Sequence, residues 1–96
     1  MREPVFSPMA VEDLDGIVEY IARDNPPAAV RFVEALKEKC YTLARFPLQG
    51  TSRERLTKGL RAFSVGNYVI YYRPEEDTVR VERVLHGARD ADSLFG

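Results

Sequence analysis

The chain concentrates positive charge in one short segment. Residues 53 to 61 contain Arg53, Arg55, Lys58 and Arg61 against the single acid Glu54, a local charge of +3. Basic side chains at alternate positions of an extended segment, such as Arg53 and Arg55, project to one side and can bind phosphate or carboxylate groups. The segment therefore predicts either an anion or nucleic-acid contact or an ordinary solvated loop.

His86 is the only histidine in the chain and is followed by Gly-Ala-Arg-Asp at 87–90. A histidine that acts as a general base needs a nucleophile or a partner acid held beside it. The sequence has no Gly-x-Ser-x-Gly motif, and its one cysteine, Cys40, has no second Cys or His at zinc-ligand spacing. We therefore expect His86 to be a structural hydrogen-bonding residue. We also expect no metal centre and no cofactor.

Two other groups of side chains could take part in catalysis, but their sequence context indicates a structural role. The acids Glu12, Asp13, Asp15 and Glu19 occupy the polar side of an amphipathic segment, so we expect them on a solvent-exposed helix face rather than in a catalytic pair. Cys40 lies within an apolar helical stripe and is expected to be a small buried hydrophobe.

Three tyrosines could stack on nucleic-acid bases. Strand alternation places Tyr68 and Tyr72 on one face of a sheet and Tyr71 on the other. At least one of these faces should therefore be core, and core packing is the favoured interpretation.

Two helices must precede these strands. Ser7 can cap the first helix and Pro8 suits its first position, and apolar residues at helical spacing extend it to about residue 23. The run Asp24-Asn25-Pro26-Pro27 ends this helix and caps the next, which continues for about 20 residues to Phe46-Pro47. Helices joined this closely form an antiparallel hairpin.

Three strands are expected after a loop from Pro47 to Gly59. A strand through Phe63 and Val65, a Gly66-Asn67 turn and the run 68–72 predict a β-hairpin, and a turn at 74–77 leads to a third strand at 78–86. The alternation slips at 82–85, which indicates either a β-bulge or partial cover of the second face. Residues 4–6 could add a short edge strand.

The predicted fold class is α+β, with the order β-α-α-β-β-β. Neither the helix pair nor the sheet can bury its apolar side alone, so the hairpin should pack on one face of a small antiparallel sheet. The 96 residues suit a single domain, 1–96. The residues expected to share one core are Leu14, Ile17, Ile21, Phe32, Leu36, Leu43, Phe63, Ile70 and Val81.

Composition narrows the function classes. Fourteen basic and fifteen acidic residues give a net charge of −1, far from the basic excess of a non-specific nucleic-acid binder. No apolar run approaches the roughly 18 residues of a membrane helix, and no signal core follows the first residues. We therefore expect a cytoplasmic protein, unprocessed and without a membrane partner, whose contact with any nucleic acid would be local.

Several motifs, in this order and spacing, resemble the bacterial ParE toxins of the ParE/RelE superfamily. The resemblance spans nearly the whole chain, and its most specific part is the run from Arg83 to Asp90. The matching runs are Phe6-Ser7-Pro8, Tyr20-Ile21-Ala22, Asn25-Pro26, Leu43-Ala44-Arg45-Phe46-Pro47 with Gly50 and Arg53, Gly59-Leu60-Arg61, Tyr68-Val69-Ile70-Tyr71-Tyr72-Arg73, and Arg83-Val84-Leu85-His86-Gly87-Ala88-Arg89-Asp90.

The resemblance implies a toxin of a type II toxin-antitoxin pair, with a cognate antitoxin as partner and DNA gyrase as target. RelE-like relatives instead cut messenger RNA on the ribosome, commonly with a C-terminal tyrosine or histidine, and a degenerate toxin would only bind its antitoxin. Arg61 and Arg89 match positions that are basic in both branches. The tail Leu94-Phe95-Gly96 has no tyrosine and the net charge is slightly negative, and both features count against the nuclease.

Two surfaces follow from this resemblance. An antitoxin segment that orders on binding is expected to lie beside the helix hairpin and the exposed sheet edge. The target surface is expected on the basic loop and the strand ends, since local charge determines how fast and in which orientation two molecules associate. Internal ion pairs of Arg61 or Arg89 with Glu82 or Asp90 are the alternative. The expected target-binding residues are Arg53, Arg55, Lys58, Arg61, His86 and Arg89.

Overall fold

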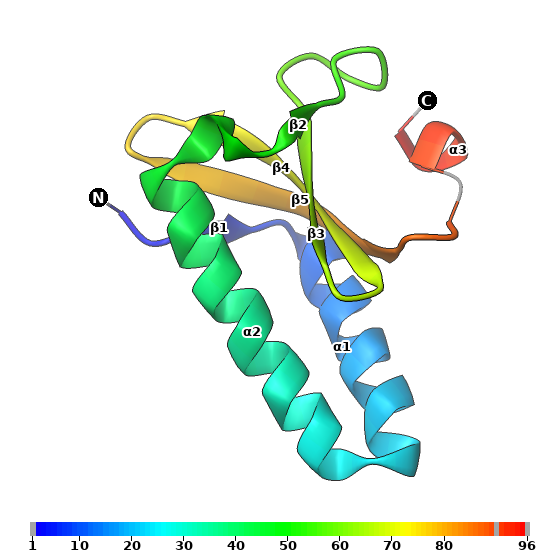
Figure 1. Cartoon of the computed structure of the whole chain (residues 1–96). Helices are drawn as coiled ribbons and strands as arrows, with labels where there is room; N and C mark the ends of the chain where they lie inside the picture. Colours follow the sequence, from blue (N-terminus) through cyan, green and yellow to red (C-terminus); the bar gives the residue numbers. More distant parts are fainter. Residues whose placement is uncertain (1, 90, 96) are drawn as a thin grey trace.

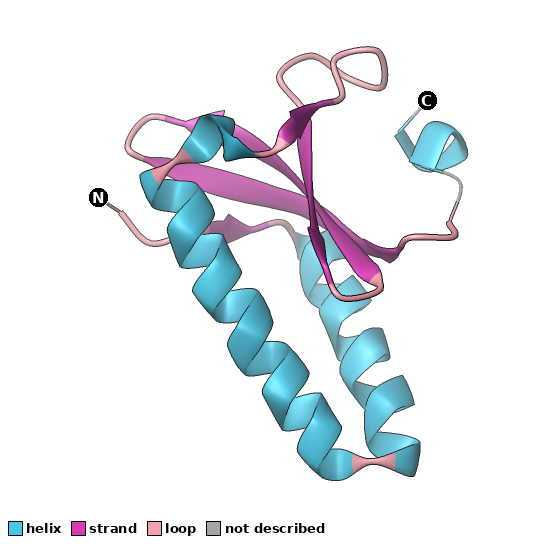
Figure 2. Cartoon of the chain, in the orientation of Figure 1, coloured by secondary structure: helices cyan, strands magenta, loops and turns pink. Residues whose placement is uncertain are grey.

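A computed structural model describes residues 2–89 and 91–95. A two-helix hairpin lies against one side of a sheet, and a short third helix lies near the C-terminus (Figures 1 and 2). The elements in chain order are β1 (Val5–Phe6), α1 (Pro8–Asp24), α2 (Pro26–Arg45), the 3-10 turn η1 (Pro47–Gln49), β2 (Thr51–Ser52), β3 (Arg61–Val65), β4 (Tyr68–Glu75), β5 (Thr78–His86) and α3 (Ala91–Phe95).

Both helices begin where the sequence predicts. The Ser7 hydroxyl accepts a hydrogen bond from the Ala10 amide at 3.0 Å, and the Asn25 side chain accepts one from the Ala28 amide at 3.1 Å. A proline follows each cap, where its missing N–H costs nothing. Asn25 is also the residue that ends α1. One residue therefore joins the helices, which fixes the tight hairpin.

The sheet has five strands in the order β1-β5-β4-β3-β2. Strands β3, β4 and β5 form the expected antiparallel meander, and Gly66 supplies the positive φ of 58° that the two-residue turn needs. The α+β class and the helix hairpin are confirmed. One difference is β1, which pairs in parallel with β5, so the sheet is mixed. The others are β2 and α3, which the sequence pattern did not predict.

The break in the apolar-polar alternation at residues 82–85 is a β-bulge at Glu82. Tyr71 pairs with Arg83 and Tyr72 with Val81, so Glu82 is the extra residue in β5. Beyond the bulge, Val84 is buried on the helix side and Leu85 on the opposite side, where α3 contributes Leu94 and Phe95. Both interpretations of the slip are therefore confirmed, because a bulge and a covered second face occur together.

The apolar residues form two clusters, and eight of the nine residues expected to share one core belong to the first of them, so that expectation is confirmed except at Ile21. The cluster beneath the helices includes Leu36, Leu43, Ile70 and Val81 as buried members, and Tyr72 and Cys40 are also inside it. Leu14, Ile17, Phe32 and Phe63 are half-buried against this cluster, and Ile21 is half-buried. The second cluster, on the outer face of the sheet, consists of Leu60, Ala62, Tyr71 and Leu85. The alternation of the tyrosines is confirmed.

Tyr72 also fixes the turn that follows α2. Its hydroxyl donates to the Pro47 carbonyl at 2.8 Å and accepts from the Gly50 amide at 2.9 Å. A Cβ at position 50 would collide with this hydroxyl and lie 2.8 Å from the Ala62 carbonyl oxygen. Glycine is therefore required at position 50 by close packing, and this contact orients the start of the basic segment.

Candidate functional site

The basic segment is a compact series of turns, not an extended strand. The Arg53 amide donates to the Leu60 carbonyl at 2.8 Å, and the Glu54 carboxylate accepts from the Gly59 amide at 3.0 Å. Gly59 has a φ of 79°, which glycine adopts without strain. The prediction that alternation directs Arg53 and Arg55 to one side is therefore wrong, because the backbone closes on itself between residues 53 and 60.

The basic side chains of this loop have different surroundings. Arg53 is half-buried and lines a hollow of about 410 Å³ on the outer face of the sheet. Arg55 reaches α3 and pairs with Asp92 at 2.9 Å, although both side chains remain mostly exposed. Lys58 is exposed. The loop therefore presents Arg55 and Lys58 to solvent and directs Arg53 toward the sheet.

Arg61 lies at the end of the sheet that carries η1. Its guanidinium donates to the Leu48 carbonyl at 3.3 Å, and the residue is half-buried beside Tyr72, its cross-strand partner. Burial raises the pKa of Tyr72, and the neighbouring Arg61 opposes this effect. Glu82, an expected ion-pair partner of Arg61 or Arg89, pairs with Arg80 at 2.9 Å instead. The other expected partner, Asp90, lies outside the described residues.

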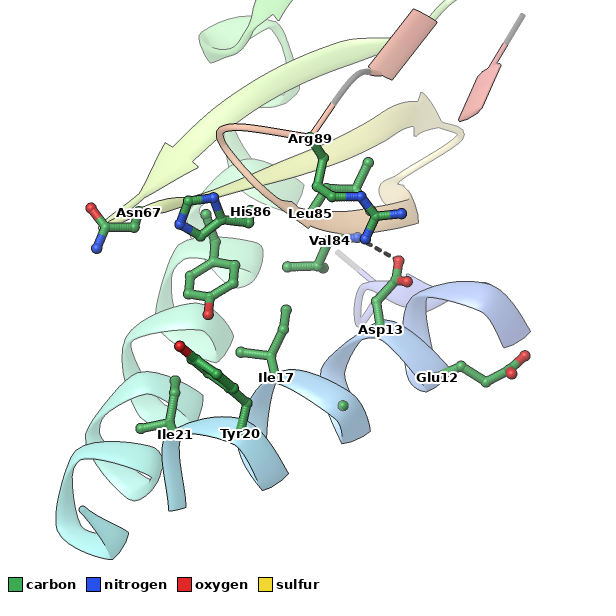
Figure 3. Close-up of a pocket in the computed structure, with 12 residues that line it drawn as sticks. Glu12, Asp13, Ile17, Tyr20, Ile21, Asn67, Val84, Leu85, His86 and Arg89 are labelled. Atoms are coloured by element: carbon green, nitrogen blue, oxygen red, sulfur yellow. Dashed lines mark hydrogen bonds between the residues drawn. The ribbon is translucent and has the colours of Figure 1, made fainter. Parts of the chain in front are cut away.

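His86 and Arg89 lie in a cleft between α1 and the end of β5 (Figure 3). The cleft has a volume of about 740 Å³. His86 Nδ1 accepts a hydrogen bond from the Ala88 amide at 3.1 Å, and its ring meets Tyr68 edge-on at 5.4 Å. The expected hydrogen-bonding role of His86 is therefore present. Arg89 is exposed at the rim.

The predicted site residues therefore form two separate groups. Arg61 pairs with Tyr72, and His86 pairs with Tyr68. These two pairs are four positions apart along β4, a distance of roughly 13 Å at about 3.3 Å per residue. Arg53, Arg55 and Lys58 belong to the loop near Arg61, whereas Arg89 belongs to the cleft with His86.

Asp13 is part of this cleft, and the prediction that it lies on a solvent face is wrong. Its carboxylate accepts hydrogen bonds from Arg83 Nε at 2.8 Å, from Arg83 Nη2 at 2.9 Å and from the Val84 amide at 3.0 Å. The hydrogen bond from Arg83 to Asp13 raises the pKa of the Arg83 guanidinium. Only 14% of the Asp13 side chain and 11% of the Arg83 side chain are exposed.

The Asp13–Arg83 pair attaches α1 to the edge of β5 just beyond β1. The neighbouring acids Glu12, Asp15 and Glu19 are exposed as predicted, so Asp13 is the one acid of the four that is partly buried. No sequence signal separates Asp13 from these acids. Its partner is 70 residues away in the chain.

Residues 2–89 and 91–95 show neither a metal site nor a membrane-spanning helix. Within this part of the chain, no group of three or more His, Cys, Asp or Glu side chains is arranged to hold a metal ion. None of the helices there is long and apolar enough to cross a membrane.

The hairpin of two helices on a mixed sheet is shared with a toxin-antitoxin protein. A chain of the structure titled "Chromosomal ParDE TA system from P. aeruginosa" matches this fold with a TM-score of 0.73 over 90% of this chain and 96% of that chain. The two sequences are 20% identical, so this match shows the fold alone.

The sequence comparisons define the family. Residues 5–91 match the family model of the ParE toxin of the type II toxin-antitoxin system parDE. The chain is also 33% identical over 89 residues to Toxin RelE2 of Caulobacter vibrioides, covering 93% of this chain and 99% of that protein. This chain belongs to the ParE toxin family, within the ParE/RelE superfamily of type II toxin-antitoxin systems. Membership of this family implies a cognate antitoxin partner.

Proposed function

We propose that this toxin arrests growth in the cytoplasm by inhibiting DNA gyrase, and that its antitoxin releases the block. The observation that supports gyrase over messenger RNA is the C-terminal tail Leu94-Phe95-Gly96, which lacks the tyrosine or histidine that RelE-like nucleases commonly carry there. Cleavage of a phosphodiester needs a proton-transfer group and a cation around the same phosphate, within hydrogen-bond reach. His86 and Arg61 lie roughly 13 Å apart along β4, at about 3.3 Å per residue, so they do not meet around one phosphate group, and Arg89 is the cation that shares the cleft with His86.

The proposed target surface consists of the predicted basic residues. Arg55 and Lys58 are exposed on the loop and can meet acidic protein or DNA held by gyrase, and the half-buried Arg53 and Arg61 lie beside them. His86 and Arg89 form a second, exposed part of this surface in the cleft beside α1. Charges of this kind act mainly on encounter rate and orientation. They therefore suit an inhibitor that binds a large target without performing chemistry.

A second candidate is a ribosome-dependent ribonuclease. The curated relative at 33% identity carries the RelE name, and this is the observation that favours it. A third candidate, a degenerate toxin, would retain only antitoxin binding.

Two parallel assays distinguish these candidates. Purified toxin is incubated with gyrase and supercoiled DNA, and separately with translating ribosomes. Loss of supercoiling or trapped cleavage with intact messenger RNA supports the gyrase target. Cut messenger RNA with unaffected gyrase refutes it and supports the nuclease, and inactivity in both assays refutes both.

The surface is tested with Arg55→Ala and Lys58→Ala. Each should weaken gyrase inhibition while the free energy of unfolding changes by less than about 0.5–1 kcal/mol, since exposed ion pairs and surface side chains contribute little. Arg31→Ala is the matched control, because Arg31 is an exposed arginine on α2, outside the loop. If both loop variants inhibit as strongly as Arg31→Ala, the loop is not the target surface.

A further inference from the structure

The turn that joins α2 to β2 holds two apolar side chains out in solvent (Figure 1). Phe46 is 58% exposed and Leu48 is 70% exposed, the largest exposed fraction among the large apolar residues that the structure describes. Neither side chain belongs to the two apolar clusters of the fold. Single exposed apolar residues are common on protein surfaces, whereas neighbouring ones form a patch, and an apolar patch is a candidate interaction site.

The backbone of this turn is already fixed. The Tyr72 hydroxyl is bonded to the Pro47 carbonyl at 2.8 Å, and the Arg61 guanidinium donates to the Leu48 carbonyl at 3.3 Å. The proline ring adds a fixed φ angle between the two apolar residues. A surface that is ordered before binding loses little conformational entropy on association. The turn therefore presents Phe46 and Leu48 in an arrangement that suits a binding site.

The apolar pair lies within a strongly basic part of the sequence. Residues 45–61 contain five basic side chains against the single acid Glu54, a local charge of +4. The Arg45 guanidinium carbon lies 5.7 Å from the centre of the Phe46 ring, a cation–π contact, and Arg45 is exposed. Aromatic residues and arginine are enriched at the centres of protein–protein interfaces. The charge around them favours an acidic partner.

An acidic protein fits this surface better than DNA does. Proteins that push apolar side chains between base pairs need many phosphate contacts to offset the cost of unstacking and bending the duplex. Within this segment, Arg53 and Arg61 are half-buried, and Arg55 is engaged in an ion pair with α3. Arg45 and Lys58 are the remaining exposed cations of residues 45–61, too few for such contacts. An apolar pocket in a protein surface needs no such compensation.

We propose that Phe46 and Leu48 are the apolar anchor of the target interface, and that they insert into an apolar pocket on an acidic protein surface of gyrase. This inference rests on the proposed function. It decides between two partners that the basic loop alone does not separate, acidic protein and DNA held by gyrase. The two apolar side chains supply most of the affinity, and the surrounding cations orient the complex.

The first test measures binding of the toxin to purified gyrase without DNA. Phe46→Ser and Leu48→Ser are compared with the parent toxin and with Val30→Ser, a matched control whose side chain is 59% exposed on α2, outside the turn. All three side chains are exposed, so the urea midpoints should stay close to that of the parent.

Each turn variant should weaken binding by at least about tenfold, as the truncation of an anchor residue does. Val30→Ser should bind like the parent. Binding of both turn variants as tight as that of Val30→Ser overturns the proposal. Binding of the parent toxin that requires DNA also overturns it.

Salt separates the anchor from the charges around it. At about 1 M salt the Debye length is about 3 Å, so the contribution of exposed charges is largely screened. The loss of affinity caused by Lys58→Ala should therefore shrink at this salt concentration, whereas the loss caused by Leu48→Ser should persist. A parent toxin that no longer binds at high salt, or a Leu48→Ser loss that disappears there, would contradict an apolar anchor.

The second test identifies what the turn contacts. The photo-crosslinking amino acid p-benzoylphenylalanine replaces Leu48, or Val30 as the control, and the purified toxin is irradiated with gyrase and supercoiled DNA. We expect a crosslink from position 48 to a gyrase subunit and none from position 30. A crosslink from position 48 to DNA, or no crosslink there while the toxin inhibits gyrase, refutes the protein pocket.

Failure of this inference and failure of the proposed target give different results. If the parent toxin inhibits gyrase and Leu48→Ser inhibits it as strongly, only the anchor is refuted. If the parent toxin arrests growth without any effect on gyrase, the gyrase target is refuted. Growth arrest then tests the anchor by itself, because arrest by Leu48→Ser as strong as that by Val30→Ser refutes it for any target.

Discussion

Replacing Asp13 by alanine should destabilise the toxin far more than replacing any other acid on α1. Asp13→Ala removes two hydrogen bonds to Arg83 and one to the Val84 amide. It also leaves Arg83, whose side chain is only 11% exposed, without its partner. Removing one member of a buried ion pair costs about 3–5 kcal/mol, and partial exposure of both side chains screens the interaction. We therefore expect a loss of about 3 kcal/mol, at the lower end of this range.

Such a loss is large beside a total stability of about 5–15 kcal/mol. Urea unfolding of the purified toxin, followed by far-UV circular dichroism, measures it, and the melting temperature should fall by about 10–20 °C. Asp15→Ala is the matched control, since Asp15 is exposed two residues further along α1, and its stability should change by less than about 0.5 kcal/mol. Equal stability of the two variants would refute the claim that Asp13 attaches α1 to β5.

A double-mutant cycle isolates the ion pair from the amide contact. Arg83→Met should cost less in the Asp13→Ala background than in the parent, with a coupling energy of about 1–3 kcal/mol. Additive losses would show that the pair contributes nothing and that only the Val84 contact matters.

Three further predictions concern the core. Leu36→Ala should lose about 2–5 kcal/mol in urea unfolding, because Leu36 is only 2% exposed; a loss below that of an exposed Ala35→Gly control would contradict the packing. Gly50→Ala should lose about 1–3 kcal/mol from overpacking against the Tyr72 hydroxyl, and a crystal structure with the Tyr72 bond to Pro47 unchanged would argue against it. Burial raises the pKa of Cys40 to about 12, so its thiol should not react with Ellman's reagent at pH 8 until urea unfolds the protein. The pKa of the Cys40 thiol is higher in the folded protein than in the unfolded chain. The contribution of this buried thiol to the free energy of unfolding is therefore complete below about pH 8.5, the ordinary thiol pKa, and is lost as the pH rises toward 12.

The sequence alone determined the parts of this protein that depend on local chemistry. Ser7 and Asn25 act as helix caps through hydrogen bonds to residues three positions away, and each is followed by proline. The Gly66-Asn67 turn depends on a backbone conformation that glycine favours. Interactions of this range leave a direct pattern in the sequence, so the helix hairpin and the meander could be predicted. The matching motifs, in order, likewise supported the family.

Only the tertiary structure decided which charged residues meet. Asp13 has the same local pattern as the exposed Asp15, and only the register of β5 past its bulge brings Arg83 and the Val84 amide to it. Periodicity also could not predict β1 as a parallel strand, since its partner is more than 70 residues away. The sequence suggested that the basic residues form a single surface, but the strands place His86 opposite the first residue of β4 and Arg61 four positions further along that strand. A side chain's local sequence sets its direction on its own element, whereas its neighbours depend on the packing of distant segments.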